Sequence, residues 1–189
     1  MFGRLFRRES EADAIAARLY GAIVAQARNP ALYTLFAVPD TVTGRFEMVV
    51  LHLILILDRL QAEGDDDKAI GQRVFDLYCT DMDRSLRELG IGDLGVPKRM
   101  KKMTEAFYGR AMAYRDALSA RDAVRLAEAV HRNVLPDADA AAALGLANYA
   151  LASGAMLAAT SRETLRHGGA LFADPAASAR SGAVTEALA

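Results

Sequence analysis

The side chains best suited to chemistry in this sequence are its histidines and the acidic residues near them. A helical bundle can hold a di-iron site when two Glu-x-x-His pairs and further glutamates face one another. One such pair occurs, Glu128 with His131. His52 lies inside a long apolar run, where a hydrogen-bonded core histidine is the expected role. A metal site at Glu128 and His131 is therefore an alternative and not the main interpretation.

Motifs that carry catalysis are missing from the sequence. It contains no Cys-x-x-Cys-His, no glycine-rich phosphate loop, no Gly-x-Ser-x-Gly elbow and no zinc-ligand spacing. The single cysteine, Cys79, cannot form an internal disulfide and is expected to be a small buried apolar residue. We therefore predict no catalytic residue and no metal site, and we expect that the protein is not an enzyme.

A cluster of cations begins one predicted helix. Its members are Lys98, Arg99, Lys101 and Lys102. The N-terminal end of a helix is the positive end of its dipole, so cations there are mildly unfavourable for stability. The cluster suits an anionic partner such as RNA phosphate, lipid headgroups or an acidic protein segment. An incidental solvated face is the alternative interpretation.

Aromatic residues follow the basic cluster on the same predicted helix. Phe107 and Tyr108 lie among several methionines at helical spacing, which is usual for a core. If some of them were exposed, they would suit a groove for the apolar helix of another protein.

The preceding helix carries a dense row of charges. Its members are Asp81, Asp83, Arg84, Arg87 and Glu88. Spacings of three and four residues favour ion pairs, for example between Asp83 and Arg87 or between Arg84 and Glu88. We expect either a solvated face or charges that hold the next loop, which contains Gly92 and Asp93.

The elements that position these residues are predicted to be helices. The chain has 189 residues, 52% of them hydrophobic, with no Trp and a net charge of −1. Apolar positions repeat at helical spacing, and Gly or Pro separates the repeats. The predicted helices cover residues 11–27, 43–63, 65–89, 97–118, 122–135 and 139–162. We predict an all-α, single-domain bundle of about six helices.

Three segments are expected along the chain. Residues 1–9 form a basic and apolar N-terminal segment that does not resemble a secretory signal, residues 10–167 form the helical domain, and residues 168–189 form a disordered tail. The alanine-rich stretch over 139–162 is long enough to span a membrane. Alanine contributes little to insertion, so packing of Leu146, Tyr149, Ser153 and Met156 against the bundle is favoured.

Several strings, taken together, resemble one family. They include Pro39-Asp40-Thr41, Gly44-Arg45-Phe46, the row from Asp81 to Glu88, Gly92-Asp93, Val96-Pro97-Lys98 and Phe107-Tyr108-Gly109-Arg110. In order and spacing they resemble the ubiquinol–cytochrome c chaperone family over about residues 20 to 135. The absence of a long targeting extension suggests a bacterial-type member.

The resemblance implies an all-helical assembly chaperone of complex III. It implies binding of newly made cytochrome b or another complex III subunit, and no cofactor. We expect an apolar groove beside a basic patch, with Lys98, Arg99, Lys101, Lys102, Phe107, Tyr108 and Arg110 as partner-binding residues. Pro39, Asp40, Gly44 and Arg45 belong to the motifs with a structural role.

Location and further partners stay open within this interpretation. We expect a cytoplasmic protein, with attachment to the inner membrane as an open possibility, and no specific DNA binding. The ribosome and an anionic membrane surface are possible partners. Two competing functions remain: a bundle enzyme with a metal at Glu128 and His131, and a membrane-surface adaptor that depends on Arg4, Arg7 and Arg8.

Overall fold

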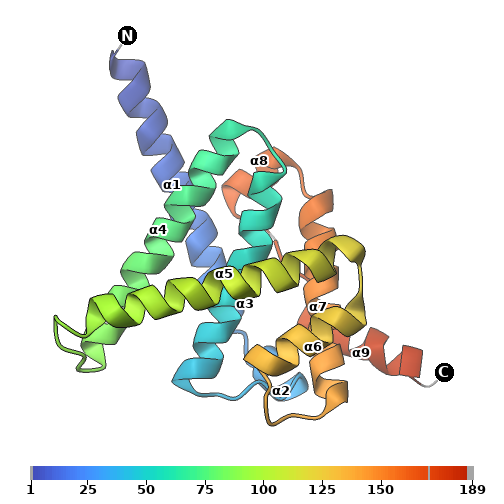
Figure 1. Ribbon diagram of the computed structural model, residues 1–189. Coiled ribbons are helices and arrows are strands. Elements are labelled where there is room, and N and C mark those ends of the chain that lie inside the picture. Colours follow the sequence, from blue (N-terminus) through green and yellow to red (C-terminus); the bar gives the residue numbers. More distant parts are fainter. Residues whose placement is uncertain (1, 170, 187–189) are drawn as a thin grey trace.

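The computed structural model describes residues 2–169 and 171–186, and this part of the chain is helical without any strand (Figure 1). The helices are α1 (Phe2–Ala27), α2 (Pro30–Leu35), α3 (Val42–Gln61), α4 (Asp65–Glu88), α5 (Val96–Ala120), α6 (Ala123–Asn133), α7 (Ala140–Ala159), α8 (Arg162–His167) and α9 (Pro175–Glu186). The all-α prediction is confirmed. The six predicted helices correspond to α1, α3, α4, α5, α6 and α7, and the three others are shorter than most of these.

Helix α3 lies at the centre of the bundle. Every residue from Val50 to Leu57 is buried, and α1, α4, α5 and α7 all contact this helix. A helix that is apolar nearly all round must be covered on all sides. The sequence in α3 therefore determines which helix the others surround.

The start of α3 is a tight turn. The side chain of Thr41 caps the helix by accepting a hydrogen bond from the Gly44 backbone at 3.1 Å. Arg45 donates to Asp40 at 2.6 Å, and this contact lowers the pKa of the Asp40 carboxyl. A Cβ atom on Gly44 would lie 2.0 Å from the carbonyl oxygen of Pro39. The predicted motif is thus the turn that leads into the central helix.

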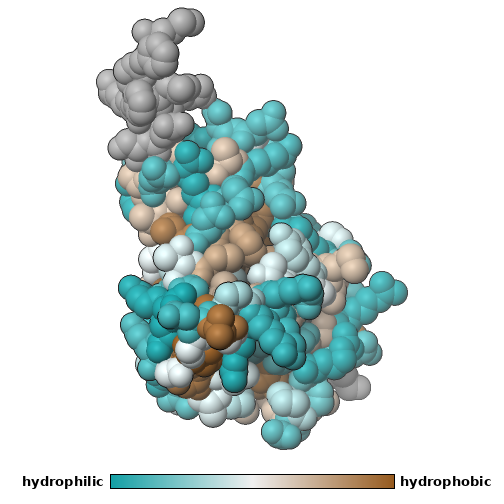
Figure 2. All heavy atoms as spheres, turned by 60° about the vertical axis from the view of Figure 1, so that its left-hand side comes forward, coloured by the Kyte–Doolittle hydropathy of each residue, from teal (hydrophilic) through white to brown (hydrophobic). Residues whose placement is uncertain are grey.

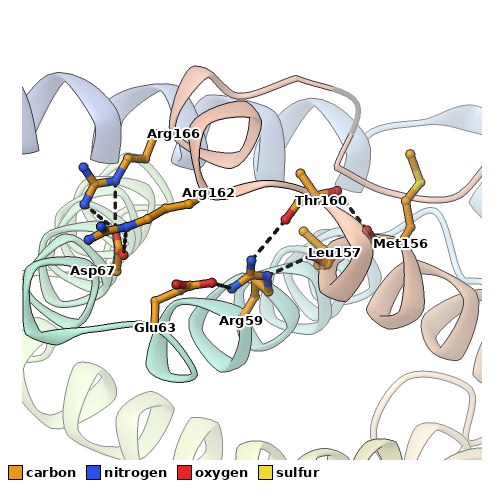
Figure 3. Close-up of polar contacts among 8 residues, drawn as sticks. All are labelled: Arg59, Glu63, Asp67, Met156, Leu157, Thr160, Arg162 and Arg166. Atoms are coloured by element: carbon orange, nitrogen blue, oxygen red, sulfur yellow. Dashed lines mark hydrogen bonds and ion pairs between the residues drawn. The ribbon is translucent and has the colours of Figure 1, made fainter.

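Buried polar contacts attach the C-terminal helices to this core (Figure 3). Asp67, in the first turn of α4, is fully buried and accepts hydrogen bonds from Arg162 at 2.5 Å and from Arg166 at 2.6 and 2.9 Å. Arg59 of α3 donates to the carbonyl oxygen of Leu157 in α7 at 2.8 Å. These contacts fix α7 and α8 against α3 and α4.

The segment after Gly168 differs from the predicted disordered tail. Leu171 is buried, and the ring of Phe172 meets His52 edge-on with centroids 4.8 Å apart. The Ala173 backbone donates to Ser153 at 3.2 Å, and α9 contacts both α2 and α7. The prediction of disorder was wrong for residues 171–180 because two apolar side chains, hidden in a polar and alanine-rich stretch, cover the core.

Helix α7 is the one helix among the described residues that is long and apolar enough to cross a membrane by length and composition. In the structure it packs against α3, α6 and α9. Leu146, Tyr149 and Ser153 are buried in this contact, as predicted, and Met156 is half-buried. The alanines allow α7 to approach its neighbours closely.

The N-terminal segment belongs to the first helix. Helix α1 begins at Phe2 and continues without a break to Ala27, so residues 2–9 are not a separate element. Met1 and the side chains of Arg4, Arg7 and Arg8 lie outside what the structure describes. The expected membrane contact of these arginines therefore stays a prediction.

Candidate functional site

A groove of about 450 Å³ with apolar and polar lining opens between α4 and α5. Leu57 and Leu60 of α3 and Gly71 of α4 supply buried lining. The other lining residues are Gln61, Lys68, Gln72, Phe75, Phe107, Tyr108, Ala111 and Arg115. In Figure 1, α4 and α5 diverge from their connecting turn.

Aromatic side chains form one wall of this groove. The ring of Phe75 lies 5.0 Å from that of Phe107 and 6.2 Å from that of Tyr108. Tyr108 is 62% exposed, although it belongs to this stack. Figure 2 shows hydrophobic surface in a hollow of this side of the molecule, with hydrophilic surface around it. Such a lining can accept apolar side chains of another chain.

The basic cluster lies at the N-terminal end of α5, as predicted. Lys98, Arg99, Lys101 and Lys102 are all exposed. Within the described part of the chain, Lys101 alone of the four forms an ion pair, with Glu105 at 3.9 Å. Three cations without an ion pair among the described residues thus lie in the first turns of α5, one of the two helices that form the groove.

Two predicted partner-binding residues are placed inside the fold. Phe107 is only 4% exposed and reaches the groove as part of its wall. Arg110 donates to Glu47 of α3 at 2.6 Å. Its guanidinium therefore holds α5 to α3, which corrects the expectation that it faces a partner. Of Phe107, Tyr108 and Arg110, Tyr108 is the one with an open surface.

Glu47 is a buried acid that sequence reasoning did not single out. It is 4% exposed, and its second carboxylate oxygen is buried without a hydrogen-bond partner among the described residues. Burial raises the pKa of Glu47 to about 7, although the charge of Arg110 opposes the shift. A lone acid within the apolar run of α3 was the signal that could have found it.

Glu47 is expected to make stability depend on pH. Its pKa is higher in the folded chain than in the unfolded chain, so its contribution is most favourable below about pH 4.5 and is lost as the pH rises through about 7. The variant Glu47→Gln removes this titration. The free energy of unfolding of the wild type, relative to the variant, should fall by roughly 1 to 3 kcal/mol between pH 5 and pH 8. Urea unfolding of both proteins at several pH values between 5 and 8 measures this change in free energy.

The free energy of unfolding must be compared between the wild type and Glu47→Gln, because a second buried group, His52, changes stability with pH in the opposite direction. Burial lowers the pKa of His52 to about 4, so its contribution is lost as the pH falls from about 6.5 toward 4. The effect of His52 is common to the wild type and to Glu47→Gln and cancels in the difference. A difference that stays constant with pH would contradict the assignment to Glu47.

His52 itself is a satisfied core residue, as predicted. Its Nδ1 lies 2.6 Å from the carbonyl oxygen of Met48, and its Nε2 lies 2.7 Å from the hydroxyl of Tyr149. Gln26 donates to the same hydroxyl at 2.9 Å. With Nδ1 as the donor, every polar atom of the imidazole has a partner, and α1, α3 and α7 are joined.

The charged row on α4 holds the turn that follows it. Arg87 pairs with Asp83 at 2.7 Å and also with Asp93 in the turn. Arg84 pairs with Asp81 at 2.5 Å and lies 3.9 Å from Glu88. The predicted pairs are confirmed, and the contact with Asp93 is the expected attachment of the loop.

Gly92 lies in the same turn, where its carbonyl oxygen accepts from the Gly95 backbone at 2.7 Å. This bond closes the turn just before α5 begins at Val96. The glycine-rich loop is therefore a compact connection between the two groove helices.

Glu128 and His131 do not converge with further ligands. Glu128 is exposed, and Nε2 of His131 lies 3.1 Å from the carbonyl oxygen of Ala138. Among the described residues, no group of three or more His, Cys, Asp or Glu side chains is placed to hold a metal ion. Cys79 is half-buried, and burial raises the pKa of its thiol.

A second groove of about 600 Å³ lies where α3, α5 and α7 meet. Leu55, Leu118 and Leu151 contribute apolar surface, and Gly154 leaves room between α5 and α7. Charged side chains, including Asp58 and Arg59, line it as well. The groove between α4 and α5 is distinguished from this one by its aromatic wall and by sharing α5 with the basic cluster.

The fold and this groove define a class of protein: an all-helical protein with a helix-lined groove that has an aromatic wall. Comparison with known proteins gives the family. The chain belongs to the ubiquinol-cytochrome C chaperone family, whose sequence model matches residues 34–172. The match continues past residue 135, where the resemblance of the motifs ended, and includes α7 and α8.

Individual relatives agree with this assignment. The chain is 27% identical over 120 residues to the ubiquinol-cytochrome-c reductase complex assembly factor 1 of Xenopus laevis, covering 64% of this chain and 60% of that protein. The Mus musculus protein of the same name is 24% identical over 107 residues, 57% of this chain and 36% of its own length. The chain thus spans less than two thirds of either relative. The crystal structure of the Cbp3 homolog from Brucella abortus is 46% identical, with a TM-score of 0.83, and the match covers 93% of this chain and 98% of that one.

Proposed function

We propose that this protein is an assembly chaperone for ubiquinol–cytochrome c reductase and that it holds newly made cytochrome b in the groove between α4 and α5. Membership of the chaperone family supports the first part. The observation that carries the second part is the aromatic-walled groove over α3, with exposed Tyr108 at its edge.

The physical basis of the proposal is the burial of apolar surface. A membrane protein that has not yet inserted exposes apolar segments to water, and an apolar groove lowers that cost by covering part of them. The basic cluster at the start of α5 would orient the client and make its association sensitive to salt. Tyr108 offers a large, rigid contact of the kind that dominates binding energy in protein interfaces.

Under this proposal the protein acts in the cytoplasm, at or near the membrane that receives the client. Cytochrome b or another subunit of the complex is the partner. The ribosome is a further proposed partner, because a chaperone for a new chain acts near the place of synthesis.

Site-specific crosslinking tests the groove directly. A photoreactive phenylalanine analogue is placed at Gln72 or Tyr108, which line the groove, and at Val124 on α6, which is 64% exposed and outside it. In cells that make cytochrome b, crosslinks to this subunit are expected from the two groove positions and not from Val124. Crosslinks from Val124 alone would contradict the assigned groove.

Substitution of Tyr108 by aspartate is expected to weaken client binding about tenfold, because a charge replaces an aromatic contact at the groove edge. Tyr108 is 62% exposed, so the fold is expected to tolerate the change. The measurement is complex III activity and the cytochrome b spectrum of membranes from cells in which the variant replaces the wild type. Val124→Asp, an equally exposed apolar position, is the matched control and should complement fully.

A further inference from the structure

The turn between α4 and α5 presents an apolar side chain to solvent in a fixed position. Leu94 is 98% exposed, and Leu89 at the end of α4 is 59% exposed. The turn is not loose: the Ile91 backbone donates to Leu86 at 3.1 Å, and the Gly95 backbone donates to Gly92 at 2.7 Å. The side chain of Leu94 therefore points outward from a structured turn and does not belong to a frayed end.

Backbone and side-chain contacts hold both ends of this turn. Gly90 has a positive φ of 82° and donates to the carbonyl oxygen of Arg87 at 2.9 Å, which ends α4. Arg87 also binds Asp93, the residue next to Leu94. A Cβ atom on Gly95 would lie 3.0 Å from Ile91, so Ile91 packs back against the turn while Leu94 does not. The side chain of Ile91 thus faces the turn, and the side chain of Leu94 faces solvent.

Positive charge lies on the α5 side of this apolar tip. Residues 94–104 contain the four cations of the basic cluster and no acid. The nearby acids are engaged: Asp83 and Asp93 with Arg87, Glu88 with Arg84, and Glu105 with Lys101. Lys98, Arg99 and Lys102 remain exposed without an ion pair in the described part of the chain. In Figure 2, where the turn comes forward, a small hydrophobic patch is bordered by hydrophilic surface.

We propose that the turn between α4 and α5 docks the protein on an anionic lipid surface, with Leu94 and Leu89 entering the headgroup boundary and Lys98, Arg99 and Lys102 binding lipid phosphates. An apolar tip with unpaired cations on its α5 side and acids that are already paired with arginines combines the two interactions that a peripheral membrane contact needs, since one weak anchor binds only marginally. Nucleic acid fits less well, because the tip has leucines and no aromatic ring on which a base could stack. The inference does not depend on the client in the groove.

Vesicle flotation of the purified full chain tests this surface. Vesicles of phosphatidylcholine mixed with phosphatidylglycerol are expected to recruit the protein, and vesicles of phosphatidylcholine alone are not. Leu94→Ser and the double variant Lys98→Glu with Arg99→Glu should each weaken recruitment about tenfold. Val124→Ser and Arg125→Glu, at exposed positions on α6, are the matched apolar and charge controls and should bind like the wild type.

Insertion has its own readout because the chain contains no Trp. Leu94→Trp places a single tryptophan on the tip, and its emission should shift to the blue when phosphatidylglycerol vesicles are added. The same substitution at Val124 should show no shift. Equal recruitment to both kinds of vesicle, unchanged binding of Leu94→Ser, or a tryptophan at position 94 that stays in water would each overturn the inference. Failure here leaves the crosslinking result for the groove untouched, so the two proposals can be separated.

Discussion

Replacing Asp67 by alanine is expected to lower the free energy of unfolding by about 2 to 3 kcal/mol. The Asp67 carboxylate is fully buried, and three hydrogen bonds connect it to Arg162 and Arg166 of α8 (Figure 3). Its removal leaves two guanidinium groups without their anion. The expected cost is below that of a fully buried pair, because the arginine side chains are 45% and 27% exposed and can turn to water.

Asp65→Asn is the matched control for this effect. Asp65 lies in the same first turn of α4 and pairs with Lys68, but its side chain is 97% exposed, so the change should cost well under about 1 kcal/mol. Urea unfolding measures both variants. Limited proteolysis adds a local readout, since Asp67→Ala should expose the chain after Thr160 to cleavage earlier than the wild type. Equal stability of the two variants would mean that Asp67 does not hold α8.

The central position of α3 could be predicted from sequence because it depends on the composition of this helix and not on which other helices pack against it. Residues 50–57 are apolar except for His52, and a helix of this kind has no face that can meet water. The pairs of Arg87 with Asp83 and of Arg84 with Glu88 were predictable for a related reason. Spacing along one helix sets the distance between their side chains before any tertiary contact forms.

The candidate site was predicted only in part, because burial depends on which helix covers which. Phe107 and Tyr108 are neighbours in sequence, yet one is 4% exposed and the other 62%. Periodicity alone could not give the direction in which α5 diverges from α4. The groove also uses Phe75 of α4 and Leu57 of α3, which no local motif connects to Tyr108.

The polar contacts between distant helices were missed for the same reason. Asp67 and Arg166 are separated by 99 residues, and Glu47 and Arg110 by 63. Three acids in a row at the start of α4 all suit the positive end of the helix dipole, but one of them, Asp67, is buried as the anchor of α8. Sequence spacing identifies charges that meet within a helix and gives no information about charges that meet across the fold.

Gly44→Ala is expected to lower the free energy of unfolding by about 3 kcal/mol, because the new methyl group has no room. Its Cβ would lie 2.0 Å from the carbonyl oxygen of Pro39, which already accepts a bond from the Thr41 backbone at 2.8 Å. The turn and the cap of α3 must therefore shift together. Gly109→Ala is the control: no atom lies within 4 Å of its Cβ position, so alanine should stabilise α5 by about 0.5 to 1 kcal/mol. In thermal unfolding, the Tm should fall for Gly44→Ala and rise for Gly109→Ala. A Tm shift of the same sign in both variants would mean that the contact with Pro39 does not determine the choice of glycine at position 44.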